Sequence, residues 1–179
     1  MTWLLGVGLF LLVALGYWWL KRPVYYKNVP LTGVERFLSD LLQYFADGSI
    51  LFVEHPGSPR FVQFVKYLDG KAHANLHFSF PEAEWSAPYF TKVAATLRAA
   101  AIPYTIRDTS EPLCPRFIDV DGIADPRLAF SVARAALSAL GFSEADTFRI
   151  HFKGHHSPDA ARGYAKTQIA KRRSGTGLA

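Results

Sequence analysis

The sequence is poor in cysteine: Cys114 is the only cysteine among its 179 residues. One cysteine cannot form a disulfide within the chain, which agrees with a reducing compartment. The chain also lacks the glycine-rich phosphate loops, the nucleophile turn G-x-S-x-G and the C-x-x-C pair that accompany common catalytic and cofactor sites. We therefore expect a protein that is not an enzyme and that holds no cofactor and no metal.

Charge is absent from residues 2–20, where neither an acidic nor a basic side chain occurs. A helix of these nineteen residues is about 28 Å long, close to the ~30 Å hydrocarbon core of a bilayer. The run predicts a transmembrane anchor over residues 1–22. The aromatic and basic residues expected at its ends, at the level of the lipid headgroups, are Trp3, Tyr17, Trp18, Trp19, Lys21 and Arg22.

A cleaved signal peptide is the alternative for the same run. Such a peptide has a basic start, a shorter apolar segment and small residues before its cleavage site. Here no basic residue precedes the run, and bulky aromatic residues followed by Lys21 and Arg22 occupy the cleavage zone. Basic residues flank the run only on its C-terminal side, so the positive-inside rule predicts an outside N-terminus and a cytoplasmic domain. The expected location is a bacterial-type inner (cytoplasmic) membrane, crossed once.

Net charge is concentrated at the end of the chain. Residues 1–152 carry fourteen basic and fourteen acidic side chains, whereas residues 153–179 carry six basic side chains and one acidic one. Three interpretations of this basic tail are open: contact with an anionic lipid surface, contact with an acidic patch on a partner, or a solvated tail. The residues expected to make a partner or lipid contact are Arg162, Tyr164, Lys166, Lys171, Arg172 and Arg173.

Hydrophobic periodicity predicts one α+β domain over residues 32–152, which follows a proline-containing linker over residues 23–31. The expected order is helix, three-strand antiparallel meander, helix, two strands, helix, strand. The clearest strand pattern is 71–80, where apolar residues at the even positions alternate with polar ones, as in a sheet with one buried face. The expected helices cover residues 32–46, 86–102 and 125–140, and the expected strands cover residues 50–54, 60–68, 71–80, 104–108, 116–121 and 148–152.

Two helix starts carry capping signals. Thr32 and Glu35 form a T-x-x-E capping box, in which the two side chains would satisfy free backbone N–H groups of the first turn. Asp125 is followed by Pro126, which is typical of an N-cap with proline at the first helical position.

Short strings within the domain support a resemblance to a known family. They are the segment 60–64 (RFVQF) before a hairpin, the segment 117–121 (FIDVD) before Asp125-Pro126 and an alanine-rich helix, and Gly141-Phe142 before the last strand. Residues 32–152 thereby resemble the YbjN-type, or type III secretion chaperone-like, domain family. That resemblance implies a protein-binding or chaperone-like role rather than catalysis, and it brings no active-site motif.

Histidines are the first candidate metal ligands. His73 and His77 lie on one face of the expected strand, but their Cα atoms would be about 13 Å apart, too far to share one ion. We interpret them as solvent-facing strand residues. His151, His155 and His156 gather at the end of the last strand and are interpreted as part of a polar turn.

Three aspartates are the second candidate. Asp119, Asp121 and Asp125 suggest a cation site, but a calcium loop needs acidic or amide ligands at positions 1, 3 and 5 with glycine at position 6, whereas here Gly122 falls at position 4. We interpret Asp119 and Asp121 as residues of a turn at a strand edge.

The function expected from the sequence is therefore binding. The chain is predicted to be a non-catalytic, single-span accessory subunit or assembly factor of a larger integral-membrane complex of respiratory, photosynthetic or secretory type. The alternative is a membrane-tethered chaperone or regulator of soluble clients, and an enzyme is the third possibility. The expected partners are the membrane complex and, through the tail, an anionic lipid surface; no nucleic acid is expected.

Overall fold

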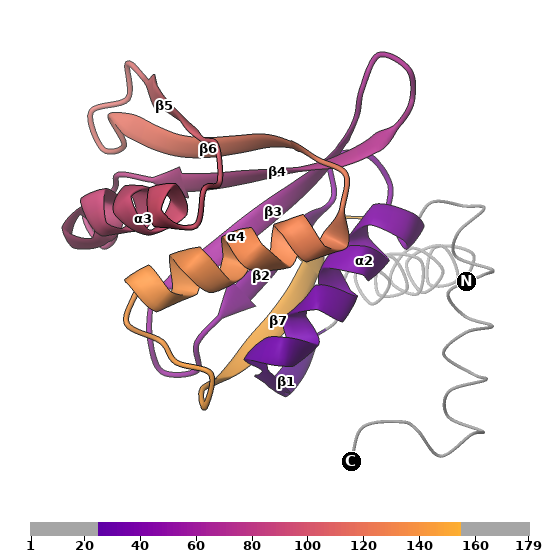
Figure 1. Ribbon diagram of the computed structural model, residues 1–179, viewed down its shortest axis with the longest axis horizontal. Coiled ribbons are helices and arrows are strands. Elements are labelled where there is room, and N and C mark those ends of the chain that lie inside the picture. The colour runs from indigo at the N-terminus through magenta and orange to yellow at the C-terminus, as the bar shows by residue number, and fades with distance from the viewer. Residues whose placement is uncertain (1–24, 155–179) are drawn as a thin grey trace, which may run out of the picture.

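The computed structural model describes residues 25–154, which form one sheet and a layer of helices (Figure 1). The elements in chain order are β1 (Tyr25–Pro30), the 3-10 turn η1 (Leu31–Gly33), α2 (Val34–Tyr44), β2 (Ile50–Glu54), β3 (Phe61–Leu68), β4 (Ala74–Pro81), α3 (Ala87–Ala99), β5 (Thr105–Asp108), β6 (Arg116–Ile123), α4 (Pro126–Ala139) and β7 (Thr147–Lys153).

The seven strands of the described chain make a single antiparallel sheet in the order β1-β7-β2-β3-β4-β6-β5. The helices α2, α3 and α4 lie together on one face of this sheet, with α4 beside both of the others (Figure 1). The last strand, β7, is inserted between β1 and β2, so the beginning and the end of the described chain meet at one side of the sheet.

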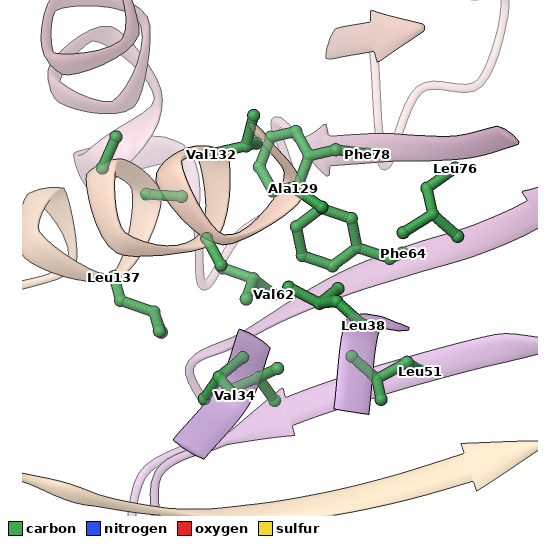
Figure 2. Close-up of a cluster of buried hydrophobic side chains, with 14 of the residues drawn as sticks. Val34, Leu38, Leu51, Val62, Phe64, Leu76, Phe78, Ala129, Val132 and Leu137 are labelled. Carbon is green, nitrogen blue, oxygen red and sulfur yellow. The ribbon is translucent and has the colours of Figure 1, made fainter. Parts of the chain in front are cut away.

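The core lies between the sheet and the three helices. In β3 and β4, the residues that point to the helices are buried, and Phe64 and Phe78 are fully buried with ring centroids 5.4 Å apart. Figure 2 shows Leu38 of α2 beside Phe64 and Val132 of α4 beside Phe78. Full burial of each such side chain contributes about 1.5–3 kcal/mol, so this layer holds the helices on the sheet.

The two predicted caps have different outcomes. The carboxylate of Asp125 accepts a hydrogen bond from the backbone N–H of Arg127 at 2.9 Å, which confirms the N-cap of α4. The capping box of Thr32 and Glu35 is wrong, because Thr32 lies in η1 and the N-cap of α2 is Gly33, which makes no side-chain cap bond. The 3-10 turn buries Leu31 and delays the start of α2, so Thr32 precedes the N-cap position.

The segment expected to be a linker forms a strand. Residues 25–30 are β1, which pairs with β7 in the register Tyr25 to His151 and Val29 to Phe148. This strand has no regular alternation of buried and exposed residues, and a register irregularity separates Tyr26 from Val29. Its existence depends on the pairing with β7 rather than on its own sequence pattern.

The predicted fold class has to be corrected where it includes a transmembrane helix. Among residues 25–154, no helix is long and apolar enough to cross a membrane. The longest of them, α4, has 14 residues and is about 21 Å long, shorter than a bilayer core. The anchor predicted over residues 1–22 lies outside the described residues. The fold class is therefore an α+β domain with a seven-stranded antiparallel sheet and three helices.

The predicted location depends on the same anchor. Without a described helix that could span a bilayer, the prediction of a single-pass inner-membrane protein with a cytoplasmic domain has no support in the structure. The predictions of a bitopic membrane protein and of a membrane tether are corrected for the same reason.

Candidate functional site

The face of the sheet that points away from α2, α3 and α4 is the outer face. In an antiparallel sheet with one buried face, the other face is usually polar. Here the strands β2 and β3 carry Phe52, Phe61, Val65 and Tyr67 on the outer face, and all four are only partly exposed. The outer face is therefore more apolar than a solvent-facing surface requires.

Four rings form a row along this face, and Trp85 continues the row from the loop before α3, where it also packs edge-on against the buried Phe80 of the core. We call these five rings the aromatic ridge. Its members, in order from the β1 edge, are Tyr25, His151, Phe52, Phe61 and Trp85. Successive ring centroids are 5.1, 4.5, 5.9 and 4.9 Å apart. The sheet register sets the first three, because His151 of β7 lies opposite Tyr25 of β1 on one side and opposite Phe52 of β2 on the other. Trp85 extends the row from the loop between β4 and α3.

The rings of the ridge stand against one another. His151 and Phe52 are stacked with an interplanar angle of 11°, and Phe61 and Trp85 are stacked at 29°. The 4.5 Å between His151 and Phe52 is close to the ~4.8 Å between neighbouring strands, so these two rings stand upright on the sheet and cover each other's faces. The other two pairs are tilted, at 45° for Tyr25 and His151 and at 56° for Phe52 and Phe61. At the two stacked pairs, a partner would therefore meet ring edges rather than the stacked ring faces.

His151 behaves as an apolar member of the ridge. Burial between its neighbours lowers the pKa of His151; the Glu54 carboxylate, 3.5 Å from Nδ1, raises this pKa and Arg149 lowers it further. Nδ1 is buried and makes no hydrogen bond. Because the lowered pKa favours the neutral imidazole at pH 7, the ridge has no net charge at its centre.

A second group on the outer face is polar. This polar cluster consists of His77 and Ser79 of β4, Arg107 of β5, and Asp119 and Asp121 of β6. Asp119 is only 4% exposed, and its two oxygens accept hydrogen bonds from Ser79 Oγ at 2.6 Å and from Arg107 Nε at 2.7 Å. The bond to Asp119 raises the pKa of Arg107, so the guanidinium remains charged.

A bulge in β6 assembles part of this cluster. The pairing of β4 with β6 shifts between Leu76 and Phe78, so that the residues Asp121 and Gly122 stand near the single residue His77. Gly122 has a φ of 67°, and its N–H donates to Tyr67 Oη at 3.0 Å. The bulge brings the Asp121 carboxylate to 2.6 Å from His77 Nδ1.

The polar cluster is not arranged for nucleophilic catalysis. A serine nucleophile needs a histidine base at its hydroxyl, whereas the Ser79 hydroxyl donates to Asp119. Within residues 25–154, no group of three or more His, Cys, Asp or Glu side chains could hold a metal ion. The hydrogen bonds instead occupy both oxygens of Asp119, so the cluster ties β5, β6 and β4 together across the sheet.

The residues singled out in the sequence occupy different places. His73 precedes β4, is exposed and hydrogen-bonds Asp69, whereas His77 lies in the polar cluster, so the two histidines belong to separate sites. Cys114 is half-buried, and burial raises the pKa of its thiol. The expected turn residues Asp119 and Asp121 lie within β6.

The predicted anchor and contact residues lie outside the described residues. These are Trp3, Tyr17, Trp18, Trp19, Lys21 and Arg22 at the start of the chain, and Arg162, Tyr164, Lys166, Lys171, Arg172 and Arg173 in the tail, together with His155 and His156.

Sequence reasoning missed the aromatic ridge. Its members come from four strands and a loop that are spread along the chain, so no local motif marks them. The available signal was the composition of β2 and β3, which carry large apolar residues on both faces although helices cover one face.

Comparison of the chain with protein-family models, with curated proteins and with solved structures gives no match.

Proposed function

We propose that the domain is a non-catalytic protein-binding domain and that the aromatic ridge is its binding surface. The observation that carries this proposal is the row of four aromatic rings on the outer face of the sheet, which Trp85 continues from the loop before α3. Tyr25, at the edge of the row, is 51% exposed. Large, rigid aromatic side chains are the usual energetic centres of protein interfaces.

The charge and geometry of the ridge favour a protein over a nucleic acid. Single-stranded nucleic acids bind where ring faces are free for base stacking and where basic residues line the path of the phosphates. In the ridge two of the four ring pairs are stacked face to face, and the adjacent charges, Glu54 and Arg149, have opposite sign. An apolar partner surface would be complementary to this arrangement.

The rigidity of the ridge favours a stable complex over a transient one. Rings that stack on one another lose little freedom when a partner covers them, which lowers the entropy cost of binding. We therefore propose an accessory subunit or assembly factor of a multiprotein complex, and a chaperone or regulator of transient clients is the second candidate. We limit the partner to a protein, because no described helix supports the integral-membrane complex expected from the sequence.

Site-specific photo-crosslinking tests the proposal in the native host. A benzophenone amino acid replaces Tyr25 in one full-length variant and Leu128 in the matched control. Both positions are exposed, at 51% and 39%, but Leu128 lies on α4, on the opposite side of the sheet. We expect one discrete crosslinked protein from position 25 and none from position 128.

The stoichiometry of the crosslinked species separates the two candidates. A subunit should crosslink to the same protein in most copies and co-purify with it at a fixed ratio. A chaperone should give several clients, each in a small fraction of copies. Equal crosslinking from positions 25 and 128, or none from position 25, would contradict the assignment of the ridge.

A further inference from the structure

The strand β5 forms one edge of the sheet. Its four residues pair with β6 from Thr105 opposite Asp119 to Asp108 opposite Arg116, and all four are exposed. Ile106, whose side chain points to the helix side of the sheet together with its partner Ile118, is 47% exposed. On its free side, an edge strand presents backbone N–H and C=O groups that another extended chain could pair with.

The opposite edge of the sheet is protected in ways that β5 is not. The strand β1 has a register irregularity, a left-handed residue at Asn28 with a φ of 57°, and Pro30 at its end. These features interrupt pairing with an added strand. The pairing of β5 with β6 has no such irregularity, and its sequence, TIRD, contains no proline or glycine. Of the two edges, β5 is therefore the more regular one, and within its four residues it carries the charged side chains of Arg107 and Asp108.

An open hollow of about 510 Å³ lies beside the same edge. It is lined by Arg98, Ala101, Ile102, Pro103, Tyr104 and Ile106, which come from the end of α3, the following turn and β5. Because Ile106 belongs to both β5 and the lining, a strand added at β5 would project alternate side chains into the hollow. This volume lies within the range of pockets that hold small ligands, so it has room for a side chain.

The hollow has one charged lining residue, Arg98. It donates a hydrogen bond to Tyr104 Oη at 3.0 Å and makes no ion pair within residues 25–154. The site thus combines an apolar wall with a cation that lacks a carboxylate. A complementary segment carries an apolar side chain and a neighbouring acidic one. The basic residues 153–179 of this chain do not meet that requirement, because their six basic side chains would repel Arg98.

We propose that β5 and the adjacent hollow bind an extended segment of a partner protein by strand addition, with an apolar residue of the segment in the hollow and an acidic residue at Arg98. The four residues of β5 supply few backbone hydrogen bonds, so the hollow and Arg98 determine the specificity. This site is separate from the aromatic ridge, which occupies the outer face near the other end of the sheet.

A defined peptide tests this proposal with the full-length chain. The probe is a short, acetylated and amidated peptide that alternates valine with threonine and ends with one glutamate. Its binding is followed by fluorescence anisotropy, and the binding site by hydrogen exchange with mass spectrometry. We expect saturable binding and slower exchange in the segment that contains residues 105–108. A peptide of the same sequence with N-methylated backbone amides should not bind, because it cannot pair with β5.

Two substitutions identify the hollow. Ile106→Lys should weaken binding by about tenfold or more, whereas the matched control Leu68→Lys, at a position with 45% exposure on β3, should not change it. Arg98→Gln should weaken binding of the glutamate peptide several-fold and leave a glutamine peptide unaffected. Circular dichroism establishes that each variant is folded.

Four results would overturn the proposal. They are no binding of the peptide, equal binding of the N-methylated peptide, slower exchange elsewhere than in β5, and a dimer in sedimentation analysis that Ile106→Lys converts to a monomer. The last result would assign the edge to a second copy of this chain.

Discussion

Arg60 Nη1 lies 2.5 Å from the carbonyl oxygen of Leu140, a residue 80 positions further along the chain. Leu140 is the C-cap of α4, where free carbonyl groups and the helix dipole favour a cation. The guanidinium is held between two rings, 4.6 Å from the centroid of Phe142 and 5.5 Å from that of Tyr89. A residue that precedes β3 therefore completes the end of the central helix.

Removal of this guanidinium should destabilise the domain. We expect Arg60→Met to lower the free energy of unfolding by about 1.5–3 kcal/mol, since a charge-assisted hydrogen bond to a helix end is lost while the stem of the side chain is kept. Urea unfolding followed by circular dichroism measures the change. Arg98→Met, at an exposed position on α3, is the control and should shift stability by less than about 0.5 kcal/mol. Equal effects of the two substitutions would remove the capping role of Arg60.

Lys66 has the corresponding position at the end of α2. It is buried, and its Nζ donates to the carbonyl oxygens of Leu42 at 2.5 Å and Phe45 at 2.7 Å. Burial lowers the pKa of Lys66 from its ordinary value of 10.5, although Asp47 raises it in part. Between the lowered pKa and 10.5, the unfolded chain binds more protons at this residue than the folded chain does.

The pH dependence of stability follows from this difference in bound protons between the unfolded and the folded chain. The contribution of Lys66 to the free energy of unfolding should rise as the pH increases through the window between its lowered pKa and 10.5. In Lys66→Met, this rise should be absent, and stability at neutral pH should be lower by about 1–3 kcal/mol, because two carbonyl groups lose their donor. Urea unfolding of both proteins at several pH values above 8 provides the measurement. If the stability of Lys66→Met rises with pH in the same way, the rise comes from another titratable group and not from Lys66.

Asp119 and Asp121 should differ in their contribution to stability. Asp119→Asn replaces a buried acceptor of two hydrogen bonds and should lower the free energy of unfolding by about 1–3 kcal/mol. Asp121→Asn changes an exposed carboxylate and should have an effect below about 0.5 kcal/mol. Thermal unfolding of both variants checks the difference, and the opposite order would contradict the central place of Asp119 in the polar cluster.

Substitutions of Phe78 and Phe52 should distinguish an effect on the stability of the domain from an effect on partner binding. Phe78→Ala removes a fully buried ring and should cost about 3–5 kcal/mol. Phe52→Ala removes a partly exposed ring of the ridge and should cost less, but it should weaken the crosslinked complex proposed for position 25. Urea unfolding measures the first effect and co-purification the second. If Phe52→Ala leaves the complex intact, the ridge is not its binding surface.

The local elements of the domain could be predicted because their patterns are local. The alternation in β4 gives the buried positions Leu76, Phe78 and Phe80, and Asp125 with Pro126 gives the start of α4. By contrast, β1 could not be predicted, since its pairing partner β7 lies more than a hundred residues away in the sequence.

The candidate sites could not be predicted because they depend on strand order. Tyr25, His151 and Phe52 become neighbours only when β7 is placed between β1 and β2. Likewise, His77 and Asp121 meet through a bulge that needs the left-handed Gly122. The sequence shows the aspartates and the glycine but not which strand lies beside them.

The position of β1 has a mechanical consequence. Tyr25 begins β1 and pairs with His151, two residues before β7 ends at Lys153, so the chain enters and leaves the sheet at the same end of an antiparallel pair. Tension between the two flanking segments would load this pair at one end, and its hydrogen bonds would break one after another instead of together. The first ring pulled from the ridge would be that of Tyr25. Traction on the chain would thus act on the proposed binding surface first, before the core of the domain is disturbed.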